Sequence, residues 1–306
     1  MKILKILAFA YIALFSCNAY SVNMFELKEK RINQKDYLEP VYEYVIKKSF
    51  FDDEFILQLL AEKDNFPFTS KKQGSVFFEI FNHLADKEHI IIYLAHPYNM
   101  TFKEVEQLME HEDGEKFFDG IFGMYYEENK YSSLQYLYPA FAENHIHLIT
   151  NSSKTLDINT KEDLKKYKGL YVKTDFLPKF AIKDAKRLGL TESADFGHAF
   201  EDLFTGRVDF IVASNYLSQI ELYKVGLRAY ARYSQNPIWS APLFLKFPPK
   251  MMNHPRLESL KKYFKSAEYK QVRDKAFETL LERYRENTKG IVPPTYMNTY
   301  QSLINQ

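Results

Sequence analysis

The chain has 306 residues, of which 46% are apolar, so it is long enough for two domains or one large domain with an ordinary core. Its 41 basic residues are balanced by 40 acidic ones, which argues against a nucleic-acid partner. Aromatic residues reach 16%, from 23 Tyr and 26 Phe as well as a single Trp. This surplus suits an aromatic-lined cleft, although a genome rich in A and T would also produce it.

The first 21 residues have the layout of a secretory signal peptide. Lys2 and Lys5 form a basic start, residues 6–15 are uncharged and apolar, and small residues follow at Ala19 and Ser21. Ten residues rise only about 15 Å as a helix, which is too short to cross a bilayer. An ordinary core helix fits this order of features poorly. We therefore expect export, with cleavage after Ala19 or Ser21.

Cys17 is the only cysteine, and residues 14–17, "LFSC", look like a bacterial lipobox. Phe15 is bulky for its position in such a motif, so we favour a cleaved signal over a lipid anchor at Cys17. The mature chain would then have no thiol for a disulfide, a nucleophile or a thiolate metal site. Removing residues 1–21 takes away two lysines and no acid, so the formal net charge falls from +1 to −1.

Strands and helices are predicted to alternate from residue 55 onward, after a charged, weakly patterned extension at residues 22–54 that we expect to lean on the main body. The first half is predicted to contain a strand at 55–61, a helix around 76–84, a strand at 89–95, a helix capped by Thr101 and Glu104, and strands at 117–124 and 145–150.

The second half continues the alternation. Its predicted elements are a short helix capped by Thr160 and Asp163, a strand at 170–174, a helix at 178–188, a short helix ending at Gly206, a strand at 208–214, an extended segment at 236–248 and a long helical tail from Pro255 to about Gly290. Such alternation predicts an α/β fold with parallel sheets and helices on both faces. Ligands in these sheets bind beyond the carboxyl ends of strands, which directs attention to the loops after Ala61, Met124, Thr174 and Ser214.

Four motifs occur in a recognisable order. They are "DNFPF" at residues 64–68 with Gly74, "GEKFFDGIFGMYYEENK…YLYPAF" at 114–141, "INTKEDLKKYKGLYVKT" at 158–174 and "AFEDLFTGRVDFIVAS" at 199–214. Together they resemble the bacterial extracellular solute-binding proteins of family 3, the periplasmic amino-acid-binding subunits of ABC importers. The resemblance covers roughly residues 55–285.

The resemblance implies a type II periplasmic binding protein fold, with two lobes joined by two hinge strands. Lobe 1 would comprise residues 22–148 and 238–306, and lobe 2 residues 149–237. A small-molecule ligand would bind between the lobes and favour their closed state, without catalysis, cofactor or metal. The protein would be a periplasmic monomer with a membrane permease or sensor as its partner.

The carboxylate clamp of the family is altered in this chain. The resemblance places an Arg nine residues before the motif's Pro, and counting back from Pro139 gives Lys130, which offers a compact charge and no planar fork. The two threonines that commonly precede that Arg correspond to Tyr125 and Glu127. Lys130 is therefore either a ligand contact or a solvated loop residue. Glu127 and Glu128 are expected on the surface, unless one attracts a cationic group of the ligand.

Aromatic residues are the other candidates in lobe 1. Phe66 and Phe68 stand where the family places an aromatic wall, with core or rim packing as the alternative. Tyr125 and Tyr126 follow a strand end, and alternation along the strand predicts that one of them points into the cleft.

In lobe 2, Thr174 and Asp175 end a strand ahead of a helix N-terminus. Asp175 would oppose a bare anion, so this loop suits a neutral or cationic group. The family often has an Asp where this chain has Ser214, followed by Asn215, so the clamp for a ligand amine is weakened too. We include all four as ligand-binding candidates.

Other chemistry is poorly supported. His145 and His147 share one side of a predicted hinge strand, but two ligands do not make a zinc site. Asp119 and Asp209 match structural aspartates of the family, and Trp239 is expected to pack in the second hinge region. No "GxSxG", P-loop or "GxGxxG" motif occurs.

We expect a periplasmic protein that captures a small polar, amino-acid-like solute for an ABC importer. The alternative is a ligand-sensing or regulatory protein of the same fold with no transport role, which the altered clamps favour. An enzyme on this fold, similar to periplasmic dehydratases, would need Glu127 or Glu128 as its acid or base, and we expect no enzyme.

Overall fold

The computed structural model describes residues 25–30, 41–46, 55–60, 76–88, 90–96, 119–126, 133–174 and 177–297. The predicted signal peptide, the lipid-anchor site at Cys17 and the helix predicted after Thr101 lie outside these residues. Within them, no helix combines the length and the apolar character that a membrane span needs.

The described strands form one twelve-stranded sheet in the order β1-β2-β4-β3-β5-β12-β7-β10-β8-β9, with β6 beside β12 and β11 beside β7. One end of this sheet belongs to the first lobe, where β3 runs parallel to both β4 and β5. The first-lobe elements are β1 (Phe25–Lys30), β2 (Val41–Ile46), β3 (Phe55–Leu60), α2 (Val76–Glu88), β4 (Ile90–His96), β5 (Gly120–Tyr125), β6 (Gln135–Tyr136), α8 (Pro249–Met252) and α9 (Pro255–Phe264).

The other end of the sheet belongs to the second lobe, where β8 runs parallel to both β9 and β10. The second-lobe elements are the 3₁₀ helix η1 (Lys161–Lys166), β8 (Gly169–Val172), α5 (Lys179–Arg187), β9 (Thr191–Ser193), α6 (Phe196–Phe204), β10 (Phe210–Ser214), α7 (Asn215–Lys224), η2 (Arg228–Tyr230) and β11 (Ala231–Tyr233). The predicted parallel α/β units are thus confirmed in each lobe.

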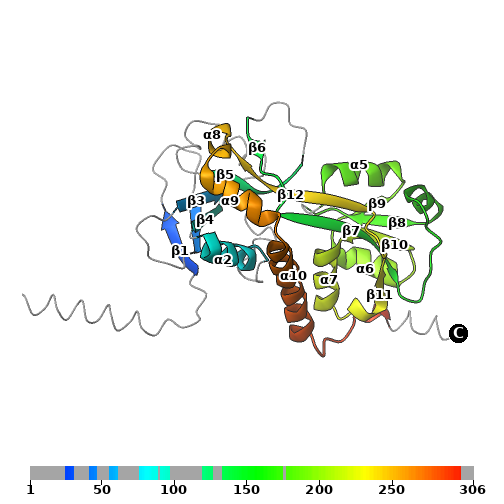
Figure 1. Cartoon of the computed structure of the whole chain (residues 1–306). Coiled ribbons are helices and arrows are strands. Elements are labelled where there is room, and N and C mark those ends of the chain that lie inside the picture. The colour runs from blue at the N-terminus through cyan, green and yellow to red at the C-terminus, as the bar shows by residue number, and fades with distance from the viewer. Residues whose placement is uncertain are drawn as a thin grey trace, which may run out of the picture.

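Two long strands join the lobes. β7 (Ala142–Asn151) and β12 (Trp239–Phe247) pair antiparallel with each other, and then β12 pairs with β5 while β7 pairs with β10. Figure 1 shows both strands running side by side from one lobe to the other. The two-lobed fold with two hinge strands is therefore confirmed. The lobe boundaries at residues 148, 149, 237 and 238 stay a prediction.

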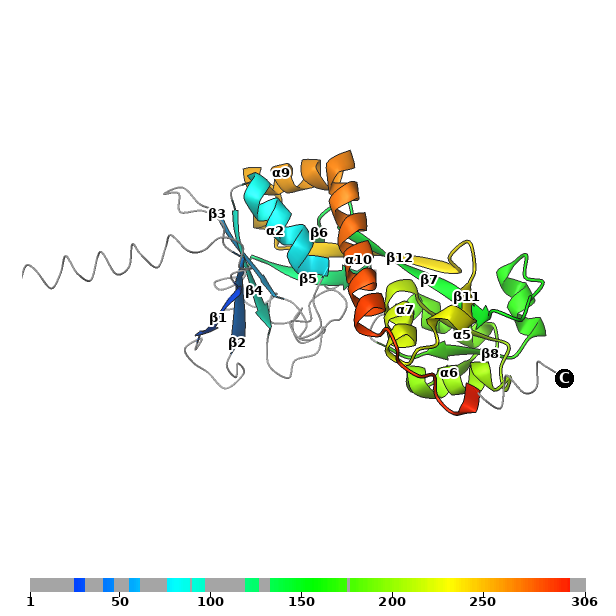
Figure 2. The same ribbon diagram turned by 90° about the horizontal axis from the view of Figure 1, so that it is seen from below.

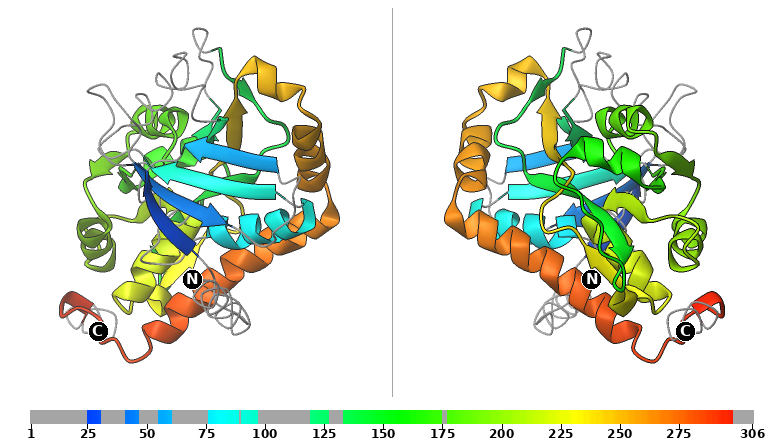
Figure 3. Two further views of the ribbon diagram at one scale, coloured as in Figure 1. Left: turned by 90° about the vertical axis from the view of Figure 1, so that its left-hand side faces the viewer. Right: turned by 90° about the vertical axis from the view of Figure 1, so that its right-hand side faces the viewer.

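Helix α10 (Ala267–Asn287) lies across the junction of the two lobes. It packs against α2 of the first lobe and α7 of the second, as the view in Figure 2 shows. The ring of Phe277 on α10 stacks on Tyr216 of α7, with centroids 3.9 Å apart. Figure 3 shows α10 running diagonally along one edge of the molecule beside α2. The C-terminal tail thus braces both lobes.

Several local predictions need correction. The helix capped by Thr160 and Asp163 is a 3₁₀ helix, although its capping box is present. The helical tail divides into α9 and α10, because Ser266 caps the second helix by accepting a hydrogen bond from the Tyr269 N–H at 3.0 Å. The N-terminal extension contacts the main body as expected, because β1 pairs with β2 and β2 pairs with β4. The loop expected after Ser214 is instead the start of α7.

The first-lobe core is rich in phenylalanine. Phe77 on α2 stacks on Phe81 at 3.9 Å between centroids and meets Phe122 of β5 edge-on at 4.1 Å. Phe122 also packs against Phe141, which directly precedes β7, at 4.7 Å. All four side chains are at most 1% exposed. The strand that leads to the cleft is thereby fixed against both the helix layer and the start of the hinge.

Replacing Phe122 with alanine should lower the free energy of unfolding by about 3–5 kcal/mol, because the substitution leaves a cavity in a core that aromatic rings fill. Phe180→Ala is the matched control, since the Phe180 side chain is 47% exposed and its removal leaves no buried cavity. Urea unfolding of both variants measures the difference. Equal losses of stability would contradict the packing described for Phe122.

Candidate functional site

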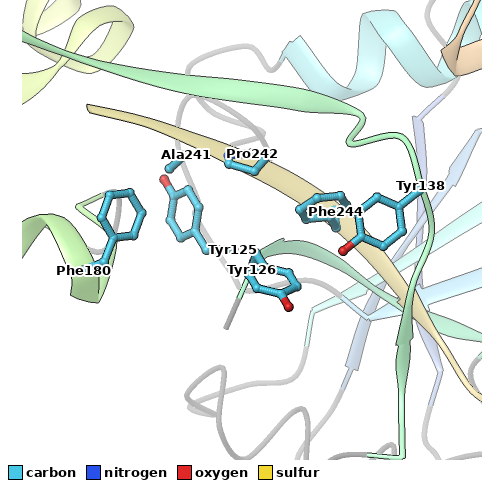
Figure 4. A pocket seen from close by; sticks show the side chains of 7 residues that line it. All are labelled: Tyr125, Tyr126, Tyr138, Phe180, Ala241, Pro242 and Phe244. Carbon is cyan, nitrogen blue, oxygen red and sulfur yellow. The ribbon is translucent and has the colours of Figure 1, made fainter. Parts of the chain in front are cut away.

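A cavity of about 330 Å³ lies between the lobes beside hinge strand β12. Its described lining is aromatic and apolar and draws on both lobes: Tyr125, Tyr126, Tyr138, Phe180, Ala241, Pro242 and Phe244. We call this the aromatic cavity. Figure 4 shows Phe180 projecting from α5 on one side, Phe244 and Tyr138 on the other, and Tyr125 and Tyr126 between them. Both lobes therefore contribute wall residues.

The end of β5 supplies two of these rings. Tyr125 is the last residue of β5, and Tyr126 directly follows it with its side chain 49% exposed. Both line the cavity, and contact of either ring with a ligand stays a prediction. The Tyr126 ring lies 5.2 Å from Tyr136, whose hydroxyl donates a hydrogen bond to the Tyr125 carbonyl at 3.1 Å. This contact fixes the turn of the chain out of β5.

A chain of hydrogen bonds connects the two lobes behind Tyr125. The Asn144 Nδ2 on hinge strand β7 donates to the Tyr125 hydroxyl at 2.8 Å, and the Ser214 hydroxyl donates to the Asn144 Oδ1 at 2.7 Å. Asn144 is 1% exposed and Ser214 is 5% exposed. Burial raises the pKa of Tyr125, so its hydroxyl stays neutral at any physiological pH. We call these three residues the hinge triad.

The hinge triad gives Ser214 a structural partner at the position where the family often has an amine-binding Asp. Asn215 begins α7, and its Oδ1 accepts a hydrogen bond from Gln219 Nε2 at 2.9 Å. Neither residue is among those that line the aromatic cavity. Ligand contact by Ser214 and Asn215 stays a prediction.

The remaining predicted site residues divide into two groups. Thr174 follows β8, and its carbonyl accepts a hydrogen bond from the Leu177 N–H at 3.0 Å, which leads the chain into α5. Its ligand contact also stays a prediction. The others lie outside the described residues: Phe66, Phe68, Lys130, Asp175, and the acids Glu127 and Glu128.

Sequence reasoning missed Tyr138, Phe180 and the β12 residues of the cavity. Tyr138 stands within the quoted motif "YLYPAF" and is joined to Pro139 by a cis peptide bond. Phe180 lies in the first turn of a helix that begins after Pro178. An aromatic residue at such a helix start is a sequence pattern that could have marked it as a candidate site residue. The β12 residues carry no such signal, since only the pairing with β5 and β7 places them in the cleft.

Lys246 of β12 lies behind the aromatic cavity. Its side chain is 2% exposed, and its ammonium lies 4.5 Å from the centroid of the Tyr136 ring. The Tyr136 ring in turn lies 5.2 Å from Phe244, which lines the cavity. Lys246 thus makes a cation–π contact with Tyr136 behind the cavity lining.

The histidines of the hinge have separate partners. His145 Nδ1 lies 2.9 Å from the Ser240 hydroxyl, whereas His147 Nδ1 lies 2.9 Å from the Ser234 carbonyl. In the described part of the chain, no group of three or more His, Cys, Asp or Glu side chains is placed to hold a metal ion. Asp209 accepts a hydrogen bond from the Lys168 N–H at 2.7 Å and pairs with Lys154, in keeping with a structural role.

Solved structures with the same arrangement are solute-binding proteins and a ligand-binding core. An ancestral cationic amino acid solute-binding protein is 15% identical, with a TM-score of 0.55 over 74% of this chain and 95% of that one. The GluR0 ligand-binding core in complex with L-glutamate is 12% identical, with a TM-score of 0.53 over 74% and 98%. The second substrate-binding domain of a putative amino acid ABC transporter from Streptococcus pneumoniae is 16% identical, with a TM-score of 0.52 over 74% and 99%.

No protein-family model matches the sequence, and no curated protein matches it either. The chain has the two-lobed α/β fold of type II periplasmic binding proteins. The resemblance to solute-binding protein family 3 is thereby confirmed at the level of the fold.

Ser214→Ala should lower the free energy of unfolding by about 1–3 kcal/mol, because it removes the donor that satisfies the buried Asn144 Oδ1. Ser240→Ala is the matched control on the neighbouring hinge strand, where the exposed Ser240 hydroxyl can exchange its partner for water. Chemical unfolding of both variants provides the comparison. A loss in Ser214→Ala no larger than in the control would count against the hinge triad.

Partial burial lowers the pKa of His147, so the folded protein resists protonation of this ring. The contribution of His147 is favourable above the unfolded pKa of about 6.5 and is lost as the pH falls below it. His147→Gln should therefore lose less stability than the wild type between pH 8 and pH 5.

His198→Gln is the control of opposite sign, because hydrogen bonding to Asp195 raises the pKa of His198 and favours its protonated form. That variant should lose more stability than the wild type over the same pH range. Unfolding midpoints at the two pH values test both, and an unchanged pH dependence in His147→Gln would contradict the effect of burial.

Proposed function

We propose that the protein captures a small polar, amino-acid-like solute between its two lobes and delivers it to an ABC importer. The observation that carries this proposal is the aromatic cavity, whose lining comes from the first lobe, the second lobe and hinge strand β12. A ligand that contacts both lobes stabilises the state in which they are close together. Such a site binds through lobe closure and requires no covalent chemistry.

The size and chemistry of the cavity support this proposal. Small-molecule pockets in proteins occupy roughly 300–1,000 Å³ and are lined mainly by apolar and aromatic side chains. At about 330 Å³, the aromatic cavity suits a solute of amino-acid size. Two of the structurally similar proteins are described as binding a cationic amino acid or L-glutamate, and a third as part of a putative amino acid ABC transporter.

The setting follows from the same proposal. An exported, periplasmic chain fits the signal-peptide pattern of residues 1–21. Such a protein would act as a monomer and without a cofactor. Its partner would be a membrane permease. Residues 22–148 and 238–306 would form lobe 1, and residues 149–237 lobe 2.

A second candidate is ligand sensing without transport. The observation that favours it is the hydrogen bond from Ser214 to Asn144, which engages the residue at the family's amine-binding position. Loss of that clamp is compatible with a site that has changed its role. Import predicts that deleting the gene abolishes cellular uptake of the bound solute, whereas sensing predicts unchanged uptake and a lost response.

A bound solute should raise the melting temperature of the purified protein, because it binds only the folded state. At a concentration of 100 times its dissociation constant it adds about 2.7 kcal/mol to the free energy of unfolding. Scanning fluorimetry across amino acids, oligopeptides, polyamines and organic acids is the measurement. Tyr138→Ala should reduce the shift, and Val292→Ala, at an exposed residue that does not line the cavity, should leave it unchanged. The absence of a shift with every solute would contradict the proposed function.

A further inference from the structure

Helix α10 is fastened to the first lobe at its N-terminal end. The Tyr269 hydroxyl donates a hydrogen bond to the carbonyl of Phe141, the residue that directly precedes β7. The Glu268 carboxylate lies 3.1 Å from Nε2 of His83 and also pairs with Lys87, both on α2. Because Tyr269 is also buried in the first-lobe core, this end of α10 moves with the first lobe.

Further along, the same helix contacts the second lobe through α7. The Tyr216 ring stacks on Phe277 with 14° between the ring planes. Leu217 and Ile220 of α7 are buried in the same hydrophobic core as Phe277 and Leu280 of α10. We call the contact of these five residues the inter-lobe brace. Although α7 directly follows β10 of the second lobe, its side chains thus pack into the core of the first.

The chain beyond α10 extends this contact onto the second lobe. Met297 is 2% exposed and belongs to the second-lobe core together with Leu227. The backbone of Ile291 approaches Gly226, just after α7, so closely that a Cβ at Gly226 would lie 2.8 Å from the Ile291 carbonyl oxygen. The C-terminal part of the chain therefore forms a further connection between the lobes, besides β7 and β12.

The inter-lobe brace and the aromatic cavity lie on opposite faces of hinge strand β12. Pro242 and Phe244 line the cavity. Leu243 and Leu245 are instead buried in the core that contains Phe277. This division follows the alternation of side chains along a strand, so β12 separates the cavity from the brace.

The second lobe is divided in the same way. Val212 of β10 shares its core with Ala181 of α5, the helix that carries Phe180. The neighbouring Ile211 shares its core with Leu222 of α7. Figure 1 shows α5 on one side of the hinge strands and α7 with α10 on the other. A rotation about these strands that brings α5 toward the first-lobe wall of the cavity therefore moves α7 away from α10.

The structure combines an intact brace with a cavity whose rings are half-exposed. Tyr138 and Phe180 of the cavity are 55% and 47% exposed, whereas Ile220 and Phe277 of the brace are buried. Covering the first pair by lobe closure loosens the contacts of the second. The apparent affinity for a solute falls with the fraction of molecules in the arrangement that binds it, so contacts that favour the other arrangement weaken binding.

We propose that the inter-lobe brace holds the lobes apart on the side of the aromatic cavity and thereby lowers the affinity for solute. Tyr216 and Phe277 are positioning residues, because they act on binding through the placement of the lobes and from the opposite face of the hinge. Solute binding then has to loosen an apolar contact, which limits how tightly the closed state holds its solute. This inference rests on the proposed function and specifies how its affinity is set.

Distances between spin labels test the brace in the absence of solute. The labels are placed at Lys183→Cys on α5 and Lys262→Cys on α9, both exposed positions, in a Cys17→Ser background. Phe277→Leu removes the stacked ring and keeps an apolar side chain, so the distribution should extend to shorter distances than with the brace intact. Tyr216→Leu should have the same effect from the α7 side.

Phe81→Leu is the matched control. The Phe81 ring also stacks with centroids 3.9 Å apart, but on Phe77 of the same helix, so its loss should destabilise the first lobe and leave the distances unchanged. Isothermal calorimetry with the amino acids and other solutes of the fluorimetric panel then measures affinity. Phe277→Leu should bind its solute about threefold or more tightly than the wild type, and the control should not. Partial unfolding cannot produce such a gain in affinity.

The outcomes separate this inference from the proposed function. If Phe277→Leu and Tyr216→Leu give the same solute-free distances as the control, or bind solute no more tightly than the wild type, the brace does not oppose closure while solute binding stands. If no solute of the panel raises the melting temperature of any of these proteins, the proposed function fails, and the role of the brace in affinity fails with it.

Discussion

Asn144 is 1% exposed and lies in hinge strand β7, which connects the two lobes. A buried amide needs hydrogen-bond partners, because leaving one of its polar atoms unsatisfied costs about 1–3 kcal/mol. Here Nδ2 donates to Tyr125 at the end of β5, and Oδ1 accepts from Ser214 at the end of β10. The two hydrogen bonds of this one side chain therefore hold the carboxyl end of β5 in the first lobe and that of β10 in the second lobe against hinge strand β7.

The aromatic cavity depends on that positioning. Tyr125 cannot leave Asn144 without breaking their hydrogen bond, and Tyr126 follows it directly into the cleft. β12 brings Phe244 to the same place through its pairing with β5 and β7. Phe180 comes from the other lobe, with 47% of its side chain exposed, close to the 49% of Tyr126. The cavity thus has walls from both lobes, so its width depends on how the lobes are placed.

Much of the fold could be predicted from the sequence because local patterns determined it. The continuous β-branched run that became β4 and the apolar spacing of α2 are examples that the structure confirms. The apolar spacing predicts one continuous helical tail, and the structure divides it at Ser266, whose side chain caps α10. α7 is absent from the sequence prediction because a loop is expected beyond the carboxyl end of the strand at Ser214, whereas the helix begins directly at Asn215.

The site could be predicted only in part. Tyr125 and Tyr126 follow a recognisable strand, so counting along the chain was sufficient to find them. Phe244 and Pro242 enter the cavity through pairing of β12 with the distant strands β5 and β7, which spacing along the sequence does not reveal. The partner of Ser214 was hidden for the same reason, since Asn144 carries no motif of its own. Lys130, Phe66, Phe68 and Asp175 lie outside the described residues.

The distance between the lobes, measured with and without solute, tests the central claim that this chain closes on a ligand. Spin labels at Lys183→Cys on α5 and Lys262→Cys on α9, both exposed positions, report on one lobe each in a Cys17→Ser background. A saturating solute from the panel should shift the distribution of distances between the labels to shorter values and narrow it. A distribution that stays the same while the solute is bound would contradict closure around the aromatic cavity.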